Sequence, residues 1–82
     1  MNWVLTSIKD INELQENIMK FVIDWVKDKN TPVPRANIIA DMEDRGTKTF
    51  TTINALNSLL KKGYIRRTRI SKSTSYIQLR GI

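Results

Sequence analysis

The chain contains no cysteine and no histidine among its 82 residues. These absences exclude disulfide bonds, thiol nucleophiles, Cys/His zinc sites and histidine general bases. No apolar run approaches the roughly 20 residues that a membrane helix requires, and the first residues do not resemble a signal peptide. The sequence therefore predicts a cytoplasmic protein with no membrane, metal, cofactor or small-molecule partner, and an enzyme is the least favoured class.

Acidic residues are absent from the second half of the chain. Residues 1–44 contain all eight acids and five bases, a net charge of −3, whereas residues 45–82 contain nine bases and no acid, a net charge of +9. Short basic clusters often form an ordinary solvated surface. Nine bases without an acid instead favour a polyanionic partner, and they mark the second half as the candidate binding half.

The length and composition predict one compact domain over residues 1–82, with 40% hydrophobic and 27% charged residues. Apolar spacing of three and four predicts a first helix over 8–29, with Ser7 or Asp10 as its N-cap. Trp25 belongs to the apolar stripe of this helix and is expected in the core. Met19 and Ile23 widen that stripe, which favours a homodimer contact through the amino-terminal segment and the first helix.

Two further helices are expected after a break at Pro32 and Pro34, with Val33 in a very short strand. The second helix is predicted over 34–44 and is followed by a turn at Gly46. The third is predicted over 48–62 and ends at Gly63. We expect its inner face to carry Phe50, Ile53, Leu56 and Leu60, and its outer face to carry Lys48, Thr51, Thr52, Asn54, Ala55, Ser58 and Lys62.

The carboxyl-terminal part is rich in β-branched and aromatic residues. Segments 64–70 and 75–80 flank the polar stretch 71–74, which predicts an antiparallel hairpin over 64–80. In the second segment Ile77 and Leu79 alternate with polar residues, so one face of the hairpin is expected on the helices. The predicted fold class is therefore α+β, a three-helix core closed by a two-stranded ribbon.

This order of elements resembles the winged helix-turn-helix regulators of bacteria, archaea and phages. The resemblance covers about residues 8–79. It is carried by Thr31-Pro32-Val33-Pro34-Arg35-Ala36-Asn37-Ile38-Ile39-Ala40-Asp41-Met42 and by the ending Leu59-Leu60-Lys61-Lys62-Gly63-Tyr64-Ile65, which is similar to MarR-type and LexA-type domains. It implies a third helix that recognises DNA and a C-terminal β-hairpin wing. The expected function is sequence-specific binding of double-stranded DNA by a small transcriptional regulator.

In that arrangement a helix in the major groove brings polar side chains to base edges. Asn54 is suited to adenine N6 and N7, and Thr51, Thr52 and Ala55 to thymine methyl groups or phosphates. The basic residues of the hairpin are suited to contact phosphates or to enter a narrow minor groove. The candidate DNA-binding residues are Arg35, Lys48, Thr51, Thr52, Asn54, Ala55, Ser58, Lys62, Arg66, Arg67, Arg69 and Lys72.

Other interpretations stay open at this stage. Winged helices also serve as protein-interaction adaptors in replication or host takeover, so the fold alone does not decide the function. An adaptor, however, has no need to gather bases and exclude acids around one helix and a hairpin. The hairpin charges also protect a strand edge from unwanted pairing. The acids of the first half are expected to be solvated charges and not a magnesium site.

Overall fold

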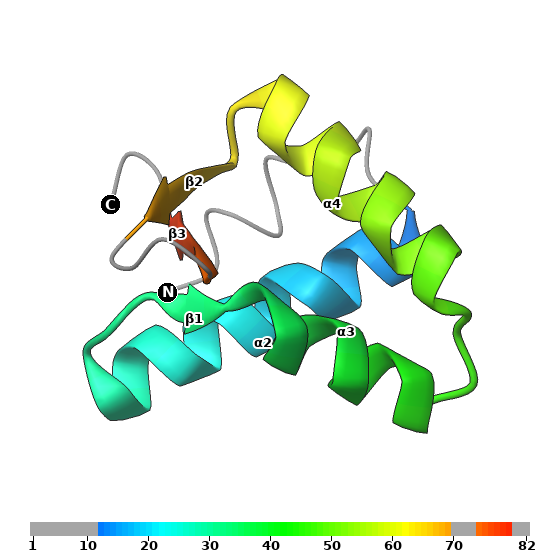
Figure 1. Ribbon diagram of the computed structural model, residues 1–82, viewed down its shortest axis with the longest axis horizontal. Helices are drawn as coiled ribbons and strands as arrows, with labels where there is room; N and C mark the ends of the chain where they lie inside the picture. The colour runs from blue at the N-terminus through cyan, green and yellow to red at the C-terminus, as the bar shows by residue number, and fades with distance from the viewer. Residues whose placement is uncertain (1–11, 70–73, 80–82) are drawn as a thin grey trace.

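The computed structural model describes residues 12–69 and 74–79, and these form an α+β arrangement of helices and an antiparallel sheet (Figure 1). The helices are α2 (Glu13–Lys29), α3 (Arg35–Asp44) and α4 (Thr49–Lys62). The strands are β1 (Val33–Pro34), β2 (Ile65–Arg69) and β3 (Ser75–Leu79). In Figure 1 the sheet lies at one end of the molecule, beside the start of α3, and α4 extends away from it.

Helix α2 begins later than the sequence predicts. Ser7 and Asp10 lie outside the described residues, and Asn12 has an extended backbone, so an unbroken helix over 8–29 is wrong. Asn12 is the N-cap: its side-chain oxygen accepts from the Gln15 N–H at 2.9 Å, and the Gln15 side chain accepts from the Asn12 N–H at 3.3 Å. This reciprocal pair satisfies two amides that a helix start otherwise leaves open.

The boundaries of α3 and α4 agree closely with the predicted ones. Pro34 precedes α3 as its N-cap, and α3 begins at Arg35. Helix α4 ends at Gly63, whose φ of 86° is the left-handed conformation that favours glycine. The N–H of Gly63 donates to the carbonyls of Leu59 and Leu60, both at 3.1 Å, and so closes the last turn of the helix.

The sheet has three strands instead of the expected two. Its order is β1-β3-β2, with Val33 opposite Ile77 on one side and Arg67 opposite Ile77 on the other. The short strand expected at Val33 therefore exists, and it pairs with the hairpin. The reason is that Val33 is fully buried, and pairing with β3 satisfies backbone groups that burial removes from water.

One apolar core joins the helices to the sheet. Its members come from every helix and strand and are less than a tenth exposed: Ile18, Met19, Val22, Val33, Ile38, Met42, Ala55, Leu56, Leu59, Ile65 and Ile77. Trp25, expected in the core, is partly buried and packs against it, and its ring N–H donates to the Thr31 hydroxyl at 3.2 Å. Met19, by contrast, lies inside the core, and Ile23 packs partly buried against it. The apolar surplus expected on α2 is largely used within one chain.

Candidate nucleic-acid interface

Helix α4 turns a mixed polar and aromatic stripe away from the core. Its buried residues are Thr52, Ala55, Leu56 and Leu59. At about 100° per residue, the opposite side of the helix carries Phe50, Asn54, Asn57 and Lys61, and each of these residues is exposed. We call these four residues the outer stripe. Thr51 is exposed beside it and Ser58 is half-buried at its edge.

The predicted orientation of α4 is wrong by roughly a quarter of a turn. Thr52 is fully buried and Ala55 is only 6% exposed, so neither side chain is available to DNA. Phe50, expected in the core, is 72% exposed. The spacing of Phe50 with Ile53 and Leu56 is what places Phe50 on the predicted inner face. Thr52 and Ala55 are small enough to fit where α4 packs against its neighbours, and Leu59 completes that buried face.

Burial of Thr52 leaves its hydroxyl without a hydrogen-bond partner among the described residues. An unpaired buried hydroxyl costs roughly 1–3 kcal/mol. We therefore expect Thr52→Val, which keeps the shape and removes the hydroxyl, to raise the free energy of unfolding by about 1 kcal/mol. Urea denaturation followed by circular dichroism measures this change. A decrease would show that the hydroxyl is satisfied in solution.

The amino ends of α3 and α4 carry cations and lack a capping side chain. Arg35 is the first residue of α3 and Lys48 is the N-cap of α4, and neither helix has an acid in its first turn. Helix α2 differs in both respects, because it has a capping box and Glu13 and Glu16 in its first turn. The positive end of a helix dipole and a nearby cation both attract anions. At the start of α4 the Glu43 carboxylate already accepts a hydrogen bond from the Thr49 hydroxyl at 2.7 Å.

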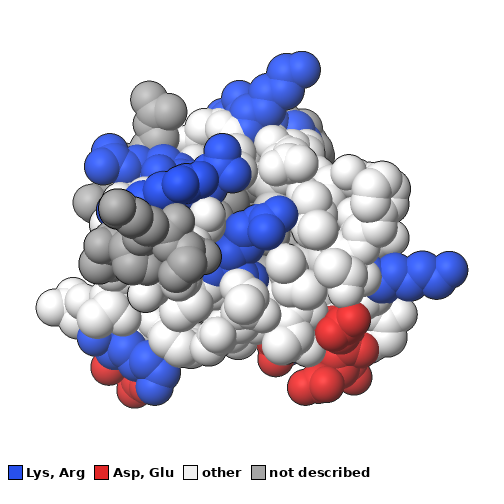
Figure 2. Space-filling model, in the orientation of Figure 1, with Lys and Arg blue, Asp and Glu red and all other residues white. Residues whose placement is uncertain are grey.

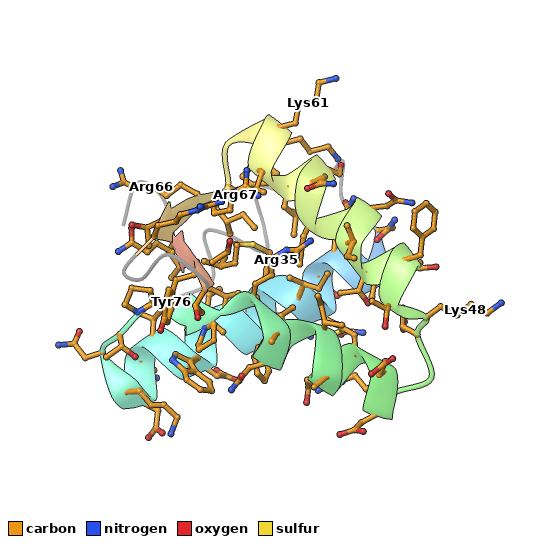
Figure 3. All side chains as sticks on the ribbon, viewed as in Figure 1. Arg35, Lys48, Lys61, Arg66, Arg67 and Tyr76 are labelled. Carbon is orange, nitrogen blue, oxygen red and sulfur yellow. The ribbon has the colours of Figure 1, made fainter. Side chains whose placement is uncertain are left out.

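The arginine residues of β2 lie on both faces of the sheet. Arg67 and Arg69 pair with Ile77 and Ser75 and share the face of the buried Ile65, whereas Arg66 pairs with Gln78 on the other face. Figure 3 places Arg67 and Arg35 toward the middle of the view and Arg66 at its outer edge. The arginines of β2 are therefore not one group, although Arg66, Arg67 and Arg69 are all exposed.

Arg66 borders an open pocket of about 290 Å³ between the end of α2 and the sheet. The pocket is lined by Val26, Asn30, Thr31, Pro32, Arg66, Gln78 and Leu79. Arg66 and Gln78, which pair across the sheet, both border the pocket. Lys72, the remaining candidate of the hairpin, lies outside the described residues.

Several basic residues on the surface take no part in the ion pairs between described residues. The ion pairs between described residues are Lys20–Glu16, Lys29–Asp28 and Arg45–Asp41. In the same part of the chain, Lys48, Lys61, Arg66, Arg67 and Arg69 have no acidic partner. Figure 2 shows blue side chains over the sheet, the centre and the ends of α4, and red ones along the lower edge, where those on the left lie beside further blue side chains. One face of the protein therefore carries bases that no described acid neutralises.

Several of the residues that the sequence marks as candidates are accessible on α3 and α4. Lys48, Thr51, Asn54 and Lys62 are exposed on α4, and Arg35 is half-buried at the start of α3. Phe50, Asn57 and Lys61 were missed, although the 100° rotation per residue identifies them once Thr52 is placed in the core. Within the described ranges, no three acids come together as a group able to hold a metal ion.

Comparisons with known proteins do not assign the chain to a family. No protein-family model, no curated protein and no solved structure matches this chain.

The described helices are too short or too polar to cross a lipid bilayer.

Proposed function

We propose that this protein is a winged-helix protein that binds double-stranded DNA sequence-specifically and acts as a small transcriptional regulator. The order helix, short strand, helix, turn, helix and hairpin supports this proposal. The observation that carries it is the outer stripe of α4, which offers hydrogen-bonding side chains. Basic residues that have no acidic partner among the described residues lie around them. An exposed helix of this kind fits the width of the major groove.

In this proposal α4 contacts the DNA bases, and the basic residues around it contact the phosphate backbone. Helix α4 enters the major groove, where Asn54 and Thr51 approach base edges. Arg35 and Lys48 lie at helix starts, and Arg67 and Arg69 lie on β2. These four residues contact the phosphate backbone. Phosphate contacts supply affinity and fix the orientation, and base contacts supply the preference among sequences.

A salt series on two duplexes tests the proposal. The protein is titrated against a mixed-sequence duplex and against a duplex selected from a random pool, at several salt concentrations. We expect affinity for both duplexes to fall steeply as salt rises, because condensed counterions are released on binding. The selected duplex is expected to keep an advantage at every salt concentration. Absence of binding to both duplexes at low salt would refute the proposal.

The proposal includes a homodimer that contacts two half-sites about one helical turn apart. A single α4 spans only one short half-site, which supports a second copy. Because Met19 belongs to the core of one chain, it does not supply the contact. Sedimentation velocity at tens of micromolar, with and without DNA, gives the number of copies. Monomer alone under both conditions would remove the dimer from the proposal.

Exposure of Phe50 favours one second candidate, a protein-interaction adaptor that uses α4 to hold a partner protein. The adaptor does not account for the separation of charges, whereas a DNA-binding protein does. The same salt series discriminates between them, because an adaptor gains nothing from counterion release on duplex DNA.

A further inference from the structure

Phe50 is the only large hydrophobic side chain of residues 12–69 and 74–79 that is largely exposed. A single exposed apolar residue is common on protein surfaces and carries no argument alone. Its position, however, is specific. Phe50 lies in the first turn of α4, in line with Asn54 and Asn57, on the side opposite the core.

The chemistry of the outer stripe matches one kind of base pair. A side-chain amide pairs with N6 and N7 of adenine, and an apolar side chain contacts the 5-methyl group of thymine. Guanine is most often recognised by arginine or lysine. Phe50, Asn54 and Asn57 carry two amides and a phenyl ring, and a cation, Lys61, appears only at the far end of the stripe.

The length of the outer stripe sets the number of base pairs within reach. Phe50 and Asn57 are seven residues apart, which is roughly 10 Å along a helix that rises 1.5 Å per residue. Base pairs are stacked about 3.4 Å apart, so this distance corresponds to about three base-pair steps. Lys48 at the helix start and Lys61 near its end lie outside that span (Figure 3). In the proposed complex these two lysines are placed to contact the phosphates that flank the site.

We infer that Phe50 is a specificity-determining residue that contacts the 5-methyl group of a thymine in an A·T-containing major-groove site. The inference rests on the proposed function and adds to it the base, the atom and the residue. Phe50 contributes apolar contact without a hydrogen bond, so it distinguishes thymine from cytosine through the methyl group. Asn54 and Asn57 face the neighbouring adenines.

Uracil substitution tests this contact, because it removes the thymine methyl group and leaves base pairing unchanged. A duplex is selected from a random pool with the wild-type protein, and each thymine is then replaced singly by deoxyuridine. One buried methyl group contributes about 0.8 kcal/mol, which is about fourfold in affinity. We expect one deoxyuridine position to weaken wild-type binding about fourfold.

The Phe50→Ala variant should bind the thymine duplex at least about fourfold more weakly and should lose the response at that position. Phe50→Leu retains an apolar side chain and should retain part of the response. Asp24→Ala, an exposed change on α2, serves as the control and should keep the whole wild-type pattern. Circular dichroism confirms that the variants are folded.

Three outcomes separate the possibilities. Loss of one uracil response in Phe50→Ala supports the inference. Binding by Phe50→Ala with every uracil response intact, or no response in the wild type, overturns the inference and leaves DNA binding standing. Failure of the wild-type protein to bind any duplex refutes the proposed function and the inference together, and transfers Phe50 to the adaptor interpretation.

Discussion

Replacing Arg67 and Arg69 with glutamine is expected to flatten the plot of log K against log salt by roughly 1.8. Both residues are exposed on β2 and share the sheet face that carries Ile65. Each phosphate contact contributes about 0.9 to the slope through counterion release, so two contacts give the expected change. In 0.1 M salt the same two contacts correspond to roughly a sixtyfold loss of affinity, if they contribute nothing at 1 M.

The loss should be nearly the same for the selected and the mixed-sequence duplex, because phosphates carry no direct sequence information. A modest change in A/T preference at the edge of the site is compatible with an arginine in a narrow minor groove. Titration of both duplexes at several salt concentrations measures the slopes.

Two controls make this measurement specific. Lys20→Gln with Lys27→Gln removes the same charge from exposed positions of α2 and should change the slope much less. Arg66→Gln tests whether the two faces of β2 contribute differently to phosphate contact, because Arg66 lies on the opposite sheet face with Gln78. An unchanged slope in the Arg67 and Arg69 variant would place β2 away from the phosphates and favour edge protection as the role of these charges.

Replacing Asn54 with alanine should weaken binding to the selected duplex by about 1–3 kcal/mol, or roughly 5- to 150-fold. Asn54 is exposed in the middle of the outer stripe, where its amide has no partner among the described residues. The loss comes from two hydrogen bonds to adenine, so the preference at one position of the site should relax.

Affinity for mixed-sequence DNA should change little in the Asn54 variant, and the salt slope should stay the same. Asn37→Ala is the matched control, because it removes the same amide from an exposed position on α3. Competition titration with singly mutated duplexes measures the preference at each position. An equal loss on selected and random DNA would contradict base contact by Asn54 and assign it to the backbone.

Local signals in the sequence predict the ends of α3 and α4 well. Proline at position 34 and glycine at position 63 restrict or permit backbone angles by themselves, so they mark helix ends without knowledge of the tertiary structure. The start of α2 is harder to predict from the sequence, because Ser7, Asp10 and Asn12 all have side chains suited to an N-cap. The backbone conformation determines which of them caps the helix.

Packing determines what local signals do not. Thr52 has a methyl group and a hydroxyl, and its burial depends on which side of α4 meets α2 and α3. Because Phe50 is assigned to the core in the prediction, the predicted inner face of α4 is rotated by roughly a quarter of a turn from the buried face. The pairing of Val33 with Ile77 joins segments far apart in the chain, and the face of each wing arginine follows from the register of β2 and β3.

Strand β1 has a mechanical consequence, because it leads into α3 without a spacer. Val33 is held by Ile77, and Arg35 begins the helix two residues later. Across the sheet, Arg67 and Val33 flank Ile77 at roughly 10 Å from each other. A pull on β2 and β3 is thus transmitted to the start of α3 through paired backbone. The backbone positions of Arg35 and Arg67 are therefore fixed relative to each other, so a polyanion that contacts both residues orders only their side chains.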